Sequence, residues 1–279
     1  MRATRLIMAG LATAVALMPV GTPIPVAGAS APSFCSGLGG GWDGQYCTTE
    51  VRSERLATRY IRMAVPGDLI DHPVAGPPIR DYLSKLFTNW RVKGASMVVD
   101  SWGNENFEIF QHGTALTTVF HEDYHADGPY INNGYRTFTF DMAAGRQLQL
   151  TDITKAGVDP YATIPQLGAP YISEALDRAF WEHRPGDYPF VPERFTPDNV
   201  FSGGYRSWAL TPDELILYMP DYPVSHDTPI QYNQMQWFMD GGNVQAHIPL
   251  AALRSILRPE YGGSASLDEG EATLGPPQQ

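Results

Sequence analysis

The residues around position 120 constrain the fold most, because they carry a zinc-protease pattern inside a segment that otherwise resembles a β-strand. Residues 121–125 read His-Glu-Asp-Tyr-His, which matches H-E-x-x-H. On a helix this spacing puts two imidazoles on one face beside a carboxylate that activates water. The flanks favour a strand, since residues 114–120 are rich in β-branched and aromatic side chains and residues 126–129 (Ala-Asp-Gly-Pro) form a turn signal that ends a helix. We therefore predict an extended conformation for this segment.

In a strand the pattern divides between two faces. His121, Asp123 and His125 then share one face of the strand. The opposite face carries Leu116, Thr118, Phe120 and Tyr124. A third zinc ligand is also missing from its expected place, since Ile131 stands where the extended protease pattern has a histidine.

Three interpretations of this segment remain open. The first is a solvated strand face that runs into a loop. The second is a non-catalytic metal or ligand site, made of His121, Asp123, His125 and Asp127. The third is a zinc protease in which His121 and His125 hold the metal and Glu122 activates water.

The first residues resemble a secretory signal peptide. Arg2 and Arg5 precede an apolar run over residues 6–20, and residues 27–29 (Ala-Gly-Ala) are a plausible cleavage site. No later segment reaches 18 consecutive apolar residues, so we expect no stable membrane insertion. We predict a signal peptide over residues 1–29, a protein that is secreted or located in the cell envelope, and a disordered Gly/Ser/acidic tail over residues 261–279.

The negative net charge of the chain argues against some classes of binding partner. Removing the predicted signal peptide removes two arginines and no acidic residue, so the formal net charge falls from −11 to −13. Such a chain is not expected to bind nucleic acid or anionic membranes. A basic protein or a neutral glycan fits this charge better.

Cys35 and Cys47 are the only cysteines of the chain. An exported protein with one such pair usually forms one disulfide. We predict this bond, which closes a short loop and stabilises the fold by about 3 kcal/mol in the chain-entropy model. A redox function is not expected, because the spacing differs from C-x-x-C.

The periodicity of apolar residues predicts helices among many strands. We expect a helix over residues 77–90, a second over 172–180, and a short third after Pro249. Strands are predicted for residues 59–65, 96–102, 107–111, 114–124, 135–141, 205–210, 214–219 and 243–248. Residues 211–213 (Thr-Pro-Asp) join two of these strands as a hairpin. This mixture places the chain in the α+β class.

Other catalytic motifs are missing from the sequence. It has no G-x-S-x-G elbow, P-loop, dinucleotide fingerprint or Cys/His zinc cluster, so we expect no cofactor. An esterase with dispersed catalytic residues remains open. Trp42, Trp102 and Trp237 lie in polar surroundings, where an exposed aromatic ring suits a sugar or a protein partner. The candidate binding residues are His121, Asp123, His125, Asp127, Tyr130 and Trp102.

Several segments, in order, resemble a known family. The cysteine pair followed by residues 60–66 (Tyr-Ile-Arg-Met-Ala-Val-Pro) resembles the N-terminal part of exported mycobacterial immunogenic antigens, often labelled mannan-binding proteins. Residues 135–153 are similar to that family's strand-turn-strand, residues 205–220 to its hairpin, and residues 244–257 to its last strand and helix. The same C-terminal module occurs in the extracytoplasmic, lysozyme-sensing part of RsiV-type anti-sigma factors.

The resemblance implies a β-grasp-like α+β fold with a mixed or antiparallel sheet, two main helices and a short C-terminal helix. It implies one domain over residues 30–260, divided near residue 105 into an N-terminal and an RsiV-like C-terminal part. The chain departs from the family at residues 126–130, where Ala-Asp-Gly-Pro-Tyr replaces a Gly-Gly-x-His stretch. The expected function is that of an exported, non-enzymatic binding protein for a lysozyme-like protein or for mannan, and the alternative is a secreted hydrolase.

Overall fold

The computed structural model describes residues 30–125, 131–179, 195–219, 230–232, 235–237 and 244–264. The α-helices are α1 (Ala31–Gly37), α2 (Gly67–Ile70), α3 (Gly76–Gly94), α4 (Leu150–Ile153), α5 (Pro160–Ala179) and α6 (Leu250–Leu253). The first strands are β1 (Gly41–Trp42), β2 (Tyr46–Arg52), β3 (Thr58–Ala64), β4 (Ser101–His112), β5 (Ala115–His125), β6 (Ile131–Asp141) and β7 (Arg146–Gln147). The later strands are β8 (Trp208–Leu210), β9 (Glu214–Met219), β10 (Ile230–Tyr232), β11 (Met235–Trp237) and β12 (Val244–Pro249), and two 3₁₀ turns, η2 (Val200–Tyr205) and η3 (Pro259–Tyr261), complete the list.

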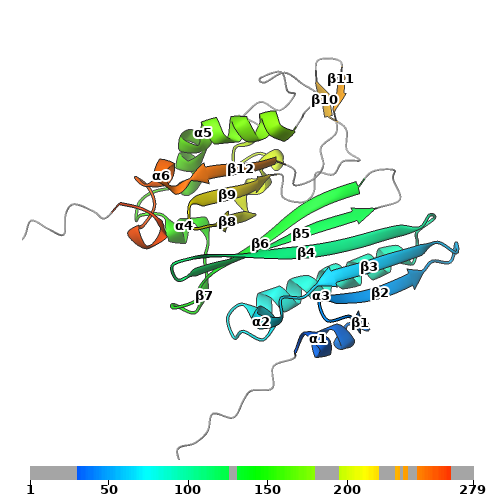
Figure 1. The fold of residues 1–279 in the computed structure, drawn as a ribbon. Helices are drawn as coiled ribbons and strands as arrows, with labels where there is room; N and C mark the ends of the chain where they lie inside the picture. The colour runs from blue at the N-terminus through cyan, green and yellow to red at the C-terminus, as the bar shows by residue number, and fades with distance from the viewer. Residues whose placement is uncertain are drawn as a thin grey trace, which may run out of the picture.

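The largest unit is a seven-stranded sheet in the order β1-β2-β3-β4-β5-β6-β7 (Figure 1). All neighbours are antiparallel except β3 and β4, which are parallel. A parallel pair needs a long crossover, and α3 lies on that crossover between the two strands. The prediction of an α+β fold with a mixed sheet, two main helices and a short C-terminal helix is confirmed.

Helix α3 covers one face of this sheet, which we name the inner face. The buried residues of α3 recur at helical spacing and include Ile79, Leu83, Phe87 and Trp90. The indole of Trp90 lies against Gly103 of β4, where an added Cβ would be 2.9 Å from ring atoms. The sheet can approach the helix this closely only because residue 103 has no side chain.

We expect Gly103→Ala to lower the free energy of unfolding by about 1 to 3 kcal/mol, because the added methyl overpacks the contact with Trp90. Thermal unfolding followed by circular dichroism measures the loss. Gly37→Ala is the matched control, since an added Cβ at this position would meet no atom within 4 Å. Equal stability of the two variants would contradict the packing described for α3.

A second, smaller sheet lies on the opposite, outer face of the large sheet. Its order is β12-β9-β8, and α5 packs on its far side. Ala209, Ile216 and Tyr218 of this sheet pack against Val119 of β5. Hydrogen bonds join the sheets as well, since the backbone N–H of Trp208 and of Leu210 donate to Thr137 Oγ1 (2.9 Å) and Thr117 Oγ1 (3.3 Å). The small sheet therefore covers one end of the outer face.

The disulfide between Cys35 and Cys47 is confirmed. It joins α1 to β2 with a Cα–Cα distance of 5.3 Å, and both cysteines are fully buried. Gly40 packs on the bridge, because an added Cβ there would lie 2.5 Å from Cys47 Sγ.

Some predicted element boundaries were wrong. The predicted strands over residues 96–102 and 107–111 are in fact a turn followed by the single strand β4. The predicted second helix starts earlier, at Pro160, and continues through Pro165 and Pro170. These prolines remove backbone donors, but Ile164 and other apolar residues of α5 are buried against the small sheet and favour the helix.

Several sequence-based predictions lie outside the described residues. They concern the signal peptide at residues 1–29, most of the tail, and the candidate residues Asp127 and Tyr130. The predicted division near residue 105 falls within β4, which is one continuous strand. Among the helices of the described residues, none combines the length and the hydropathy that a membrane span requires.

Candidate functional site

The H-E-x-x-H segment forms the end of strand β5, as predicted. β5 pairs along its length with β4 and with β6. His121 and His125 are therefore about 13 Å apart along the strand, since each residue advances the chain by about 3.3 Å. Glu122 points to the opposite face and is only 5 % exposed. This geometry does not bring the two imidazoles to one metal ion, and no group of three His, Cys, Asp or Glu side chains within the described ranges is arranged to hold a metal.

The part of the outer face that the small sheet leaves uncovered is rich in polar and aromatic side chains. We name this surface the platform. It consists of Thr48 and Glu50 on β2, Tyr60 and Arg62 on β3, Trp102, Asn104 and Asn106 on β4, and His121, Asp123 and His125 on β5. Each of these side chains is partly or largely exposed.

Two aromatic rings lie side by side on the platform. The register places Glu50 opposite Tyr60, and Tyr60 beside Trp102. Tyr60 is 51 % exposed, and Trp102 is partly exposed. Gly103 pairs with Tyr124 in an antiparallel register. Trp102, one residue before Gly103, therefore lies beside His125, one residue after Tyr124. Neighbouring rings of this kind offer a flat apolar surface with polar groups at its edge.

Two residues further along the strands from Tyr60 and Trp102, the platform carries planar polar side chains. Arg62 pairs with Asn104, and Asn104 lies opposite Asp123. The guanidinium of Arg62 stacks over the ring of Tyr46, 3.4 Å from its centroid. The hydroxyl of Tyr46 donates a hydrogen bond of 2.8 Å to Asn106 Oδ1. These contacts fix the orientation of Arg62 and Asn106 before any ligand arrives.

At the His121 end of the platform, stacked aromatic rings connect the large sheet to the small sheet. The imidazole of His121 stacks on Tyr135, with ring centroids 4.5 Å apart, and Tyr135 stacks on Tyr218 at 4.6 Å. Burial, with the charge of Asp123 as a smaller cause, raises the pKa of Tyr135 to about 12. Its hydroxyl therefore stays protonated and accepts a hydrogen bond of 2.8 Å from Gln245 Nε2. His121 Nε2 also lies 3.5 Å from Asp123 Oδ1.

Two carboxyl groups lie directly behind the platform, on the inner face. Glu105 and Glu122 are opposite each other on β4 and β5, and Glu105 is fully buried. The hydroxyl of Tyr82 on α3 donates to Glu122 Oε1 at 2.9 Å. Burial first, and then the charge of Glu122, raise the pKa of Glu105 well above its ordinary value. Helix α3 covers this pair, so in this structure a sugar cannot reach it as it would reach the carboxylates of a glycosidase.

The structure brings most of the predicted candidates together. His121, Asp123, His125 and Trp102 all belong to the platform, although they come from two separate segments of the sequence. Sequence reasoning missed Tyr60, Arg62, Asn104 and Asn106. The alternation of polar and buried residues over β3 carries the signal for Tyr60 and Arg62. The two asparagines were missed because they lie between the strands predicted for residues 96–102 and 107–111.

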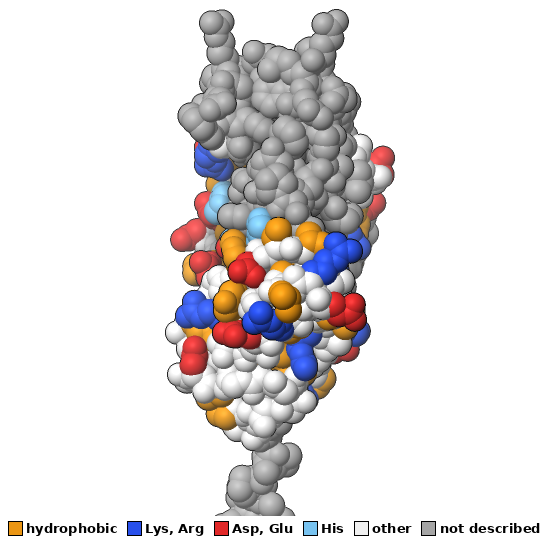
Figure 2. All heavy atoms as spheres, turned by 90° about the vertical axis from the view of Figure 1, so that its right-hand side faces the viewer, with side chains coloured by type: hydrophobic (Ala, Val, Ile, Leu, Met, Phe, Trp, Pro, Cys, Tyr) orange, Lys and Arg blue, Asp and Glu red, His pale blue; other side chains and the backbone are white. Residues whose placement is uncertain are grey.

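Acidic and basic side chains are mixed on the side of the molecule where β2, β3 and the end of α3 lie (Figure 2). Figure 2 views the molecule from the side where β2, β3 and the end of α3 lie, and its coloured residues show acidic, basic and apolar side chains interspersed. The net negative charge of the chain is therefore not concentrated on the described residues of this view.

Two family models match parts of the chain. Residues 25–67 match the model described as mannan-binding protein, and residues 151–251 match the model described as a protein of unknown function, DUF3298. The first match contains the disulfide, β2 and β3, and thus contributes Glu50, Tyr60 and Arg62 to the platform. The predicted resemblance to mannan-binding proteins is confirmed for residues 25–67.

Two solved structures of DUF3298 family proteins are similar to this chain. The protein from Pseudomonas aeruginosa PAO1 is 12% identical, with a TM-score of 0.47, over 79% of this chain and 96% of that one. The protein from Bacteroides fragilis NCTC 9343 is 12% identical, with a TM-score of 0.42, over 76% of this chain and 91% of that one. A comparison with curated proteins gave no match.

Proposed function

We propose that the platform binds mannose-containing glycans and catalyses no reaction on them. The observation that carries this proposal is the side-by-side placement of Tyr60 and Trp102 on a part of the sheet face that no described element covers. This face is partly built from the segment that matches the mannan-binding family model. An aromatic ring stacks on the apolar C–H face of a sugar. Arg62, Asn104 and Asp123 supply donors and acceptors for the sugar hydroxyls at the edge of the rings.

A neutral glycan also agrees with the charge of the protein. Binding of a sugar depends on stacking and short hydrogen bonds, which the overall negative charge of −11 does not oppose. The rigid contacts of Arg62 and Asn106 reduce the entropy lost when the ligand orders these side chains.

Export is part of the proposal. A buried disulfide is typical of proteins that fold in an oxidising compartment, and the expected signal peptide agrees with it. Determining the N-terminal residue of the protein recovered from the culture medium tests this point. A mature chain that begins near residue 30 supports export, and a protein found only inside the cell contradicts it.

The glycan proposal predicts that Tyr60→Ala and Trp102→Ala each weaken binding of a mannan oligosaccharide about 5- to 30-fold, because the loss of a stacked aromatic anchor costs about 1 to 2 kcal/mol. Isothermal titration calorimetry measures the dissociation constants. Tyr161→Ala is the matched control, since Tyr161 is an exposed aromatic residue on α5, away from the platform. Binding by Tyr161→Ala should equal that of the unaltered protein.

Other results point to other functions. If mannan does not bind, or if all three variants bind equally, the platform is not a mannan site. The expected lysozyme-like partner is tested in the same way, with lysozyme as titrant at low and high salt, and salt-sensitive binding lost in Arg62→Ala or Asp123→Ala would replace the glycan by a protein. Release of reducing ends, or hydrolysis of a short-chain ester abolished by one serine substitution, would replace binding by the hydrolase alternative.

A further inference from the structure

Strand β2 has a partly uncovered backbone edge. On one side it pairs with β3 over its whole length, from Tyr46 to Arg52. On the other side β1 pairs only with Cys47 and Thr48. No strand in the described part of the chain pairs with that side of residues 49–52. An exposed strand edge of this kind accepts a further strand through backbone hydrogen bonds.

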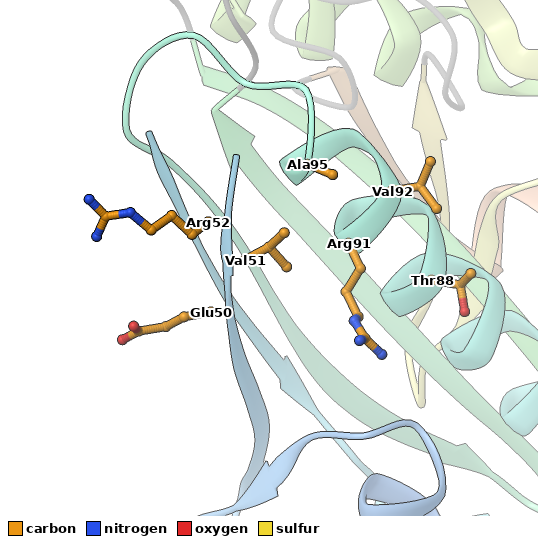
Figure 3. Close-up of a pocket in the computed structure, with 7 residues that line it drawn as sticks. All are labelled: Glu50, Val51, Arg52, Thr88, Arg91, Val92 and Ala95. Carbon is orange, nitrogen blue, oxygen red and sulfur yellow. The ribbon is translucent and has the colours of Figure 1, made fainter. Parts of the chain in front are cut away.

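A groove of about 500 Å³ runs between this edge and the last turns of α3 (Figure 3). Val51 points toward the helix, whereas Glu50 and Arg52 point to the other face of the sheet. Val92 and Ala95 supply apolar surface on the helix side, and Val92 is 67 % exposed. Val51, Val92 and Ala95 together give this groove a continuous apolar lining that a partner can cover.

We propose that this edge pairs with the same edge of a second copy of the chain. The two β2 strands run antiparallel about a twofold axis centred on Val51, which extends the large sheet across both copies. Closed twofold contacts are the commonest form of association between identical chains, and they use the same surface on each copy.

The charges beside Val51 make this edge complementary to itself. In the proposed register, Glu50 of each copy lies opposite Arg52 of the other, on the same face of the joined sheet. Two opposite-charge pairs therefore form from one Glu-Val-Arg tripeptide. A strand from another protein would form both charge pairs only if it also carried one acidic and one basic residue on either side of its central residue, in the matching order. A second copy of this chain carries them in that order, so we favour it as the partner strand.

The groove on the other face closes in the same arrangement. A twofold axis perpendicular to the sheet keeps both α3 helices on one side, so Val51 and Val92 of the two copies approach each other. The two platforms then lie together on the opposite side of the joined sheet. A dimer of this kind presents two copies of any ligand site in the same direction, which raises avidity for a repeating ligand. The proposal of the dimer does not depend on the glycan.

Analytical ultracentrifugation of the purified chain without ligand tests the dimer. The unaltered protein should sediment as a concentration-dependent dimer. Glu50→Arg should weaken dimerisation about tenfold or more, because it replaces two opposite-charge pairs by two arginine pairs. The double variant Glu50→Arg/Arg52→Glu should restore dimerisation, since it exchanges the charges and recreates both pairs.

Glu174→Arg is the control for the change of charge itself. Glu174 is an exposed residue of α5, which packs on the small sheet and not on β2, so this variant should dimerise normally. Circular dichroism checks that each variant is folded. A monomeric unaltered protein at all concentrations would overturn the proposal. So would a dimer that Glu50→Arg leaves intact, or a dimer lost in Glu50→Arg that the double variant does not restore.

Discussion

Replacing both Cys35 and Cys47 by alanine is expected to lower the free energy of unfolding by about 3 kcal/mol in the chain-entropy model, for a loop of this length. The bridge restricts the unfolded chain around a stretch with five glycines among residues 36–46, which is highly flexible when unfolded. In the folded protein the bridge holds α1 against β2, and Gly40 has no room for a side chain beside it.

Urea unfolding followed by tryptophan fluorescence measures this decrease in the free energy of unfolding. The unaltered protein in the presence of a thiol reductant should reach the stability of the double variant, whereas the double variant should not respond to the reductant. If the oxidised protein and the double variant unfold at the same urea concentration, the bridge does not stabilise the fold.

The second large effect is expected at Glu105, where we predict that Glu105→Gln stabilises the protein by about 1 to 3 kcal/mol at pH 8. A buried carboxylate without a hydrogen-bond partner costs at least the desolvation penalty of an unsatisfied polar group. Glu105 is fully buried, and neither carboxyl oxygen has a hydrogen-bond partner. The groups that face it are Glu122 on β5 and Tyr82 on α3, and Arg136 lies on the same face of β6. None of these contacts stabilises a negative charge on Glu105 through a hydrogen bond.

The effect should depend on pH with a defined sign. The pKa of Glu105 is raised in the folded protein above its ordinary value of 4.5, so the folded state retains a proton that the unfolded state releases. The contribution of Glu105 to stability is therefore fully present below about pH 4.5 and is lost as the pH rises from there through the raised pKa. Glutamine does not titrate, so the advantage of Glu105→Gln should grow from pH 4 to pH 8.

Thermal unfolding of both proteins at several pH values measures this difference. Glu174→Gln is the control, because Glu174 is exposed on α5, and this variant and the unaltered protein should give parallel pH profiles. An advantage of Glu105→Gln that stays constant with pH, or that is larger at pH 4, would contradict a raised pKa at this residue.

The sequence predicted best those elements whose local pattern agrees with their tertiary surroundings. β5 was recognised as a strand because residues 114–120 are rich in β-branched and aromatic side chains and a turn signal follows the segment. The hairpin of β8 and β9 was recognised because Thr211 begins a tight turn. The break predicted inside β4 was wrong, since Gly103 is required by the contact with Trp90 and not by a turn. That contact joins residues far apart in the sequence, so no local pattern contains it.

The candidate site could be predicted only in part for the same reason. His121, Asp123 and His125 follow from the two-residue period of one strand. Their placement beside Trp102, Tyr60 and Arg62 depends on which strands are neighbours and in which register they pair. The parallel pairing of β3 with β4, which brings Tyr60 next to Trp102, arises from the crossover through α3 and cannot be derived from either strand alone.

We infer that the platform, the part of the outer face of β2 to β5 that no described element covers, is the ligand-binding surface. An NMR titration of the isotope-labelled protein with a mannose oligosaccharide tests this inference. The resonances of Tyr60, Arg62, Trp102, Asn104 and Asp123 should shift together in a saturable way, while those of α5 and α6 stay unchanged. Shifts confined to other elements, or no shifts at saturating sugar, would contradict it.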